Sequence, residues 1–565
     1  MQKTLTLFLL LISTGLLFSQ SKYPKNYFIN PIDIPLTLSG TFGELRSNHF
    51  HAGLDMKTQQ RTGLNVYATA DGYVSRISVS LWGYGNAIYI THPNGFTTVY
   101  GHLKKFSPKI EAYLKKSQYE KESFEIKLFP SPSDLIVSKG EIIALSGNSG
   151  SSGGPHLHFE IRDVQSHILN PMLFGIEIAD HKNPMIQAVF AYSKNDTSHV
   201  NQSNKVVELA LRRQANGDIV ANKVYAYGDI GIGINAYDRL DGALNQNGLY
   251  DVEMQVNGKT TYQFTVDKFS FDESRLINSY LDYERFAKLK QRVQKCFVDH
   301  KNNDLSLYKK LVNKGFFTIK DTLDYTVTLI AKDFKGNKTE LTIPFKGKKD
   351  TILVYKDVKR TPYFFRYNQE NKIMDSLVHV NFPKNTFYED FYFDYSYANG
   401  VAKLHNSTVP ASNYFSIYFD VSKYSDDEIK SMYIASKSKY GKLNFVSSKH
   451  KDNYIYGSSK NLGEYTLASD TNAPKISAVN FTENQWLPKG TNLKVKIYDR
   501  DSGIKSYRGE INGKWILMQF DPKNGVLTHD FDESSPTGSA QTIKIVVTDN
   551  VNNSTTFTRT FNRKS

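Results

Sequence analysis

Short runs of alternating apolar and polar residues, separated by turns, fill residues 30–178 of the chain. Examples are "NVYATADGYVSRISVS" and "NAIYITHPNGFTTVYGHL". In the second of these, Asn94 and Gly95 stand between two alternating runs, which is a strong short-range signal for a β-hairpin. The pattern predicts a compact, mostly antiparallel β domain.

One segment breaks this pattern. In "SPKIEAYLKKSQYEKE" (107–122), Ser107 is placed to cap a helix and Pro108 occupies its first position, where a missing backbone N–H costs nothing. We therefore predict a short, charged helix here. The helix and the loop after it, residues 107–134, are predicted as an insertion in the β domain.

A repeat marks the later part of the chain. The segments "GIGINAYDRLDG" (231–242) and "NLKVKIYDRDSG" (492–503) align without gaps at their cores. Each half then closes with a similar pair of strands, at 325–345 and 542–561. The repeat predicts one immunoglobulin-like β-sandwich that occurs twice. An aromatic-rich, strand-like region between the two copies predicts a third sandwich.

The predicted fold class is therefore mainly β, with an antiparallel β domain followed by three β-sandwich domains. The first sandwich includes a segment with helical spacing, in which Ser270 and Glu273 form a capping-box pattern. The predicted boundaries are 1–19 (signal peptide), 30–178 (first domain), 181–347 (second domain, helical insertion 270–297), 352–468 (third domain) and 472–563 (fourth domain).

The start of the chain has the pattern of an export signal. Lys3 is followed by an apolar run over residues 5–17, and small Ser19 precedes Gln20. The run is short for a bilayer span, which favours a cleaved signal peptide over a retained anchor. No cysteine follows at the cleavage site, so the pattern is not that of a lipoprotein. We expect an exported protein with no stable membrane span after cleavage.

Composition narrows the picture further. A chain of 565 residues exceeds one hydrophobic core, which agrees with several domains. Cys296 is the single cysteine, so no intramolecular disulfide can form. The net charge of +14 fits either attraction to an anionic polymer or scattered surface lysines. Because basic clusters with stacking motifs are absent from the sequence, nucleic acid is not an expected partner.

Candidate chemistry lies in three histidine-bearing groups, "HFHAGLD" (49–55), "YGHL" (100–103) and "GGPHLHFE" (153–160). Residues two apart in a strand share a face, so His156 and His158 point the same way. His51 and Asp55 can do likewise. Two imidazoles and a carboxylate suit zinc, and further histidines beside it could take and return a proton. A lone histidine is usually structural, but the three groups together, in a fixed order within one β-rich segment, are a strong signal for such a site.

With these motifs, residues 35–176 resemble the lysostaphin-type (M23, LytM-like) zinc metallopeptidases. The family's His-x-x-x-Asp motif is matched by His51 and Asp55, and its His-x-His motif by His156 and His158. The resemblance implies that His51, Asp55 and His158 are zinc ligands. It implies catalytic roles for His156 and for His102, which follows a Tyr-Gly pair, and leaves open which of them acts as the base.

The resemblance implies a zinc-dependent endopeptidase that hydrolyses peptide bonds of peptidoglycan stem peptides or cross-links in cell-wall remodelling. The expected location is the periplasm or envelope of a Gram-negative bacterium. Some relatives lack zinc ligands and only activate other wall hydrolases, whereas all five motif positions are filled here. Two alternatives remain: a protease of exported proteins, and a non-catalytic envelope scaffold or activator whose β-sandwich domains bind envelope protein partners.

Other residues have open interpretations. Glu160 shares the predicted face of His158 and is either a partner of an imidazole or a surface carboxylate. His49 is expected at the rim of the site or facing the substrate, and the 107–134 insertion is expected as a wall or lid of the substrate groove. The repeated aspartates of "YDRLDG" and "YDRDSG" fit calcium binding or, more commonly, turns.

The accessory region, residues 181–565, contains none of the five motif residues. The sequence therefore predicts that it serves targeting and not chemistry. On this view, a protein ending near Ile178 binds zinc and cleaves a soluble peptide.

Overall fold

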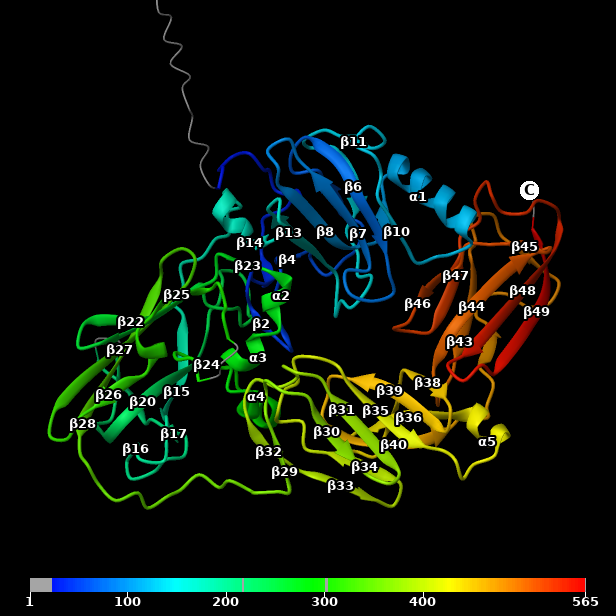
Figure 1. Cartoon of the computed structure of the whole chain (residues 1–565). Coiled ribbons are helices and arrows are strands. Elements are labelled where there is room, and N and C mark those ends of the chain that lie inside the picture. Colours follow the sequence, from blue (N-terminus) through cyan, green and yellow to red (C-terminus); the bar gives the residue numbers. More distant parts are fainter. Residues whose placement is uncertain (1–22, 216–217, 300–302, 564–565) are drawn as a thin grey trace, which may run out of the picture.

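The computed structural model describes residues 23–215, 218–299 and 303–563. The predicted signal peptide, residues 1–19, lies outside these ranges. The described residues form mainly β-strands, arranged in successive β-sheet domains along the chain, which confirms the predicted mainly β fold class (Figure 1). Within these ranges no helix has both the length and the apolar character needed to cross a membrane.

The first domain is built on a sheet with the strand order β1-β4-β13-β8-β7-β6-β10. Its central strand, β13, has two distinct faces: Leu157, Phe159 and Ile161 are fully buried in the hydrophobic core, and the alternate residues between them are polar. The strands of this sheet and of the adjoining hairpin are β1 (Leu38–Gly40), β2 (Leu45–Arg46), β3 (His49–Phe50), β4 (Leu54–Lys57), β6 (Gly72–Val79), β7 (Asn86–Thr91), β8 (Thr97–Leu103), β10 (Ile126–Leu128), β11 (Ile136–Val137), β13 (His156–Arg162) and β14 (Ile168–Leu169).

The segment predicted as an insertion contains the helix α1 (Pro108–Lys121), which begins at Pro108 as the sequence predicts. Ile110, Leu114 and Gln118 are buried at a spacing of four residues, which is one face of a helix. A small sheet lies beside it, with the strands β5 (Asn65–Tyr67), β9 (Lys105–Phe106) and β12 (Ile142–Leu145).

The second domain contains the sheet order β15-β20-β28-β27-β21-β22. Its long strand β20 pairs with β15 on one side, which places the "YDRLDG" turn at the end of the sheet. The main strands are β15 (Met185–Ser193), β20 (Val224–Tyr237), β21 (Asp251–Val256), β22 (Lys259–Thr265), β23 (Lys268–Phe269), β24 (Val293–Lys295), β25 (Tyr308–Leu311), β26 (Phe317–Ile319), β27 (Asp324–Lys332) and β28 (Lys338–Gly347).

The segment 270–297 differs from the single helical insertion predicted. It forms three short helices, α2 (Phe271–Ser274), α3 (Ile277–Tyr280) and α4 (Tyr283–Leu289). The capping box of Ser270 and Glu273 is present. Lys290 then adopts a left-handed conformation (φ 61°) that ends α4, and β24 pairs with β20. After Lys290 the chain therefore forms a strand, because hydrogen bonds to β20 stabilise it more than the helical pattern of the sequence stabilises a helix. Cys296 is fully buried beside β20.

The first and second domains share one continuous hydrophobic core. The ring of Phe269 lies 5.1 Å from that of Phe42 and 5.6 Å from that of Phe50, measured between centroids. Strand β14 of the first domain also pairs with β23 of the second. The boundary near residue 178 therefore separates two segments of the sequence whose side chains pack into one hydrophobic core.

This shared core changes the outcome expected for a protein that ends at Ile178. Exposing Phe42 and Phe50, which are 3% and 1% exposed, costs roughly 1.5–3 kcal/mol for each side chain, a large part of a typical net stability. We expect that protein to unfold at a much lower temperature than one that ends at Gly347, measured by circular dichroism. Equal unfolding temperatures for the two would contradict the structural role of this interface.

The third domain has two five-stranded sheets. Its core is rich in phenylalanine, as the aromatic run in the sequence indicates. Its strands are β30 (Asn371–Met374), β31 (Val378–Phe382), β35 (Phe415–Asp420), β39 (Tyr454–Ser459) and β38 (Ser448–Lys451) in one sheet, and β33 (Tyr395–Ala398), β34 (Val401–Leu404), β40 (Gly463–Ser469), β36 (Met432–Lys437) and β37 (Leu443–Val446) in the other.

The fourth domain also has two sheets, which enclose a separate apolar core. Its long strand β48 alternates buried and more exposed residues, as expected for a sheet with one face in the core. The strands are β41 (Lys475–Ala478), β43 (Leu493–Tyr498), β47 (Val526–His529) and β46 (Gln519–Asp521), and β42 (Gln485–Leu487), β49 (Ser554–Arg563), β48 (Ala540–Asp549), β44 (Ile504–Ile511) and β45 (Lys514–Trp515).

The chain curves back on itself, so that the fourth domain lies against α1 of the first (Figure 1). Lys115 Nζ lies 3.0 Å from Asp532 Oδ2, and the Tyr119 hydroxyl donates to Asp532 Oδ1 at 3.1 Å. Lys523 Nζ donates to the backbone oxygen of Asn148 at 2.5 Å. The insertion, predicted as a wall or lid, is therefore also a contact surface for the fourth domain.

Candidate active site

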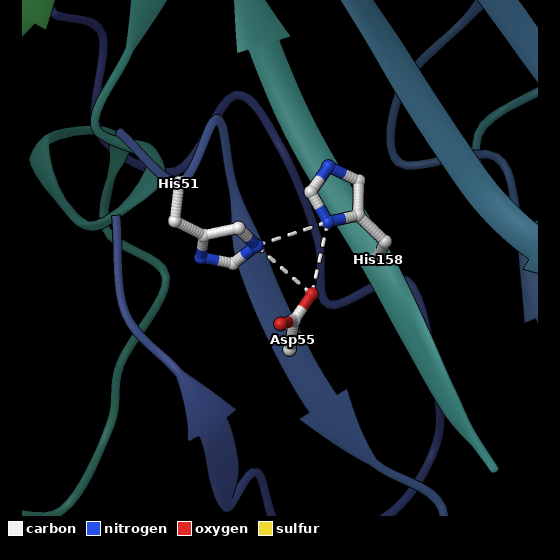
Figure 2. Close-up of side chains that lie close together, drawn as sticks. All are labelled: His51, Asp55 and His158. Atoms are coloured by element: carbon white, nitrogen blue, oxygen red, sulfur yellow. Dashed lines mark hydrogen bonds and ion pairs between the residues drawn. The ribbon is translucent and has the colours of Figure 1, made fainter. Parts of the chain in front are cut away.

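Strand β13 brings the two predicted motifs together. In the antiparallel pairing of β13 with β4, His158 lies opposite Asp55. His51 follows β3, and the chain bends at Gly53 before β4 begins. A Cβ atom at Gly53 would lie 2.3 Å from the backbone oxygen of Phe159, so only glycine permits this close approach. The bend turns His51 toward Asp55 and His158 (Figure 2).

These three side chains converge through one atom each. His51 Nε2 and His158 Nδ1 lie 3.0 and 2.9 Å from Asp55 Oδ1, and 3.2 Å from each other. All three residues are buried, with at most 8% exposed. Two imidazole nitrogens and a carboxylate oxygen form the donor set of catalytic zinc sites, and their convergence fits a single metal ion.

Each imidazole is oriented by a hydrogen bond from the ring nitrogen that points away from the converging atoms. His51 Nδ1 donates to the backbone oxygen of Thr41 at 2.8 Å, and His158 Nε2 donates to Glu160 Oε1 at 2.9 Å. In its neutral form each ring carries its proton on this nitrogen, which leaves the converging nitrogen with the lone pair that a metal ion needs. This is the outer arrangement that fixes histidines bound to metals.

Glu160 is the centre of a buried network. It is fully buried and accepts hydrogen bonds from His158, from the Tyr84 hydroxyl and from Arg162 Nε, the last at 2.7 Å. Burial alone would raise the pKa of Glu160, but the Arg162 charge and the His158 hydrogen bond lower it to about 2. Of its two possible roles, the structure supports the partner of an imidazole and not a surface carboxylate.

Asp55 is also held in its charged form. Burial by itself would raise the pKa of the Asp55 carboxyl, but the neighbouring histidines lower it well below its usual value. Arg46 Nη2 donates to the other carboxylate oxygen, Oδ2, at 3.1 Å. The Arg46 guanidinium thereby fixes Oδ2 of Asp55, and Oδ1 faces His51 and His158.

A β-bulge carries His102 into the same site. In the pairing of β7 with β8, Ile88 lies opposite Tyr100 and Asn86 lies opposite Leu103. Two steps along β7 therefore correspond to three along β8, so β8 has one extra residue there. His102 sits in this irregularity with a left-handed backbone (φ 58°), an uncommon conformation for a residue other than glycine. Bulges beside active sites commonly redirect a side chain in this way.

His102 and His156 form a pair beside the converging donors, with ring centroids 4.7 Å apart. His102 Nδ1 donates to the Ser149 backbone oxygen and His156 Nδ1 to that of Gly154, both at 2.8 Å. The Nε2 atom of each therefore keeps a lone pair. Burial, followed by the charges of His158 and His156, lowers the pKa of His102 to about 3, so this imidazole is neutral near pH 7.

The structure thus brings all five predicted site residues together. His49 lies in β3, exposed, with Nδ1 donating to the Ser47 backbone oxygen, outside the cluster of converging donors. Sequence reasoning missed Thr41, Arg46 and Ser149. Two of them act through backbone oxygens, which carry no sequence signal, and Arg46 lies nine residues from its partner Asp55 without a motif.

Glu160→Gln tests the outer network. The amide cannot carry the charge that balances Arg162, and His158 loses a charged acceptor, so we expect zinc affinity to fall about 10–100-fold. The measurement is competition for zinc with a chromogenic chelator. Glu141→Gln, at a carboxylate on the exposed turn before β12, is the matched control and leaves the affinity unchanged. Unchanged affinity in Glu160→Gln would contradict the role of this network.

Comparison with known proteins gives two family matches. Residues 49–119 match peptidase family M23, and residues 362–470, which cover most of the third domain, match a Zu5-like domain. The chain is 31% identical over 157 residues to the DD-carboxypeptidase/endopeptidase Mpg of Neisseria meningitidis, covering 28% of this chain and 27% of that protein. It is 30% identical over 161 residues to the peptidoglycan DD-endopeptidase ShyB of Vibrio cholerae, covering 28% of this chain and 31% of that protein.

Among solved structures, the catalytic domain of the antimicrobial peptidase lysostaphin from Staphylococcus simulans is 25% identical, with a TM-score of 0.18, over 24% of this chain and 87% of that one. The chain covers only 27% of the length of the Neisseria relative, so the similarity concerns one domain. That domain contains His51, Asp55 and His102, inside the residues matched by the family model. The first domain of this chain is therefore similar to the M23 metallopeptidases, with the family match over residues 49–119.

Proposed function

We propose that this chain is a zinc-dependent endopeptidase that hydrolyses peptide bonds in the stem peptides or cross-links of peptidoglycan, in cell-wall remodelling. The observation that carries the proposal is the convergence of His51 Nε2, Asp55 Oδ1 and His158 Nδ1 within an M23 domain. The Vibrio cholerae relative, which is named as a peptidoglycan DD-endopeptidase, supports the same substrate class.

In this proposal His51, Asp55 and His158 hold the zinc ion. A zinc ion supplies Lewis-acid chemistry, polarising a carbonyl and lowering the pKa of a water molecule. The remaining work falls to side chains. The Thr41 carbonyl and Glu160 keep the two imidazoles in the tautomer that binds metal.

His102 and His156 move the proton. Each is fixed through Nδ1 and presents Nε2, so either can accept a proton from the attacking water and return it to the departing amine. The histidine that has accepted the water proton carries it on Nε2 and can donate a hydrogen bond to the oxygen that becomes negatively charged, before the proton passes to the amine. His156 Nε2 lies 3.4 Å from Asp55 Oδ1, close enough to the donors to act beside them.

The proposed location is outside the cytoplasm, in the periplasm or envelope of a Gram-negative bacterium. Its support is the export pattern of residues 1–19 together with a substrate that lies outside the cytoplasm. The later domains are proposed to bind the wall or envelope proteins and to concentrate the enzyme there.

Incubation of the zinc-loaded protein with purified cell-wall sacculi and, in parallel, with casein tests the proposal. We expect soluble peptide release from sacculi, its loss with a chelator, and little turnover of casein. Casein turnover without release from sacculi would instead favour a general protease. A folded, zinc-loaded protein inactive on both would favour a scaffold.

A further inference from the structure

A second group of acidic side chains lies where the first and second domains meet. Asp180, Asp238 and Asp333 come from three separate segments, yet a carboxylate oxygen of each lies within 4.8 Å of the others. All three residues are buried, with exposed fractions of 7%, 2% and 3%. Three buried carboxylates at this separation repel one another strongly unless a cation or protons compensate.

Asp238 has an oxygen without a partner. Its Oδ1 is buried and accepts no hydrogen bond from the described residues. By contrast, Asp333 Oδ1 accepts from the backbone N–H groups of Gly336 and Asn337 at 2.7 and 2.9 Å. A buried, unpaired carboxylate oxygen on a residue grouped with two other carboxylates is costly, and a bound cation would explain it.

A cavity beside the three aspartates is large enough for a bound ion. A cavity of about 20 Å³ is lined by the three aspartates, by Thr41, Tyr250 and Lys335, and by apolar side chains such as Phe42 and Leu240. About 10–15 Å³ is enough for one water-sized sphere, so the cavity can take a single ion. Burial and the neighbouring carboxylates raise the pKa of both Asp180 and Asp238, as expected where negative charge is not balanced.

We propose that Asp180, Asp238 and Asp333 bind a calcium ion that joins the second domain to the first. An all-oxygen set of carboxylates selects a hard divalent cation. Calcium fits better than magnesium, which usually keeps most of its waters and uses one or two carboxylates. The partner of Asp238 is not Asp241, the nearby aspartate of the "YDRLDG" repeat, which instead pairs with His181 at 2.6 Å.

The fourth domain repeats the arrangement in outline, with a cluster formed by Asp470, Asp499 and Asp549. In the first cluster the Asn337 side-chain amide donates to the backbone oxygen of Asp180 and to the Asp333 carboxylate. In the second cluster the Asn553 amide donates in the same way to Asp470 and Asp549. The clusters differ at one position. Asp499 Oδ1 accepts two backbone N–H bonds, at 3.2 and 2.6 Å, whereas Asp238 Oδ1 accepts none. We therefore assign the ion to the first cluster.

A short chain of hydrogen bonds connects this site to the zinc ligand His51. Asp238 and Asn247 exchange backbone hydrogen bonds at 2.8 and 2.9 Å. The next residue, Gly248, donates its N–H to Thr41 Oγ1 at 3.1 Å, and the carbonyl of Thr41 holds His51. A calcium ion at Asp238 therefore stabilises the segment that orients His51.

The test uses the full chain, stripped of metal and reloaded with one equivalent of zinc. Calcium is added while binding is followed by titration calorimetry and unfolding by circular dichroism. We expect saturable binding and a rise in unfolding temperature. In Asp238→Asn we expect calcium affinity at least about tenfold weaker and the temperature shift lost, because one charged ligand is removed. Asp241→Asn is the matched control and behaves as the unaltered protein.

Absence of calcium binding and of a temperature shift in the unaltered protein would overturn the proposal, whatever the variants do. So would calcium binding that survives Asp238→Asn but is lost in Asp549→Asn, since the ion would then belong to the fourth domain. Magnesium that binds as tightly as calcium would overturn the choice of ion.

Discussion

Replacing His51, Asp55 or His158 with alanine is expected to remove bound zinc and turnover together. Each residue contributes one of three converging donor atoms, and two remaining donors are too few for a stable catalytic site. Zinc content should fall from about one ion per chain to background in metal analysis. Peptide release from sacculi should fall to the detection limit in the same samples.

His49→Ala is the matched control for these variants. His49 lies two residues from His51, but it is exposed and outside the cluster of donors. It should retain both zinc and activity. Full zinc content in the His51, Asp55 and His158 variants would contradict the assignment of ligands.

His102→Ala and His156→Ala should instead keep most of the zinc and lose turnover. Neither residue belongs to the converging group, and each is fixed through Nδ1 and presents Nε2 for proton transfer. Single proton-transfer groups contribute about 10²–10⁴-fold to rate, which is the loss expected here. The measurement pairs metal analysis with the initial rate of peptide release.

His167→Ala serves as the control for this pair, because His167 bonds to Asp163 and lies away from the cluster. It should leave both quantities unchanged. If a well-folded His156→Ala protein arrived without zinc, His156 would join the ligands, and the proton-transfer role would fall to His102 alone.

Local patterns account for what the sequence could predict. The two-residue period of a strand places His156 and His158 on one face of β13, and the structure has them there. Pro108 and the capping box at Ser270 act within a single turn, so the starts of α1 and α2 could be placed correctly. Such signals depend only on residues that are close in the sequence, so contacts between distant segments do not change them.

Contacts between distant segments account for the rest. The bulge that redirects His102 depends on the pairing of β7 with β8, and the Thr41 carbonyl reaches His51 only after folding. The "YDRLDG" repeat pairs Asp238 with Asp241 in sequence, whereas Asp180 and Asp333, which lie beside Asp238 in the structure, are 58 and 95 residues away. The shared core of the first two domains likewise has no signature within either segment.

Mass analysis of the fragments released from purified peptidoglycan tests the central claim most directly. The zinc-loaded protein is predicted to convert cross-linked fragments into products that have gained one water at a peptide bond. A chelator or Asp55→Ala should abolish these products, and zinc should restore them in the chelated sample. Intact peptide bonds after incubation with folded, zinc-loaded protein, or the same products from Asp55→Ala, would contradict the account.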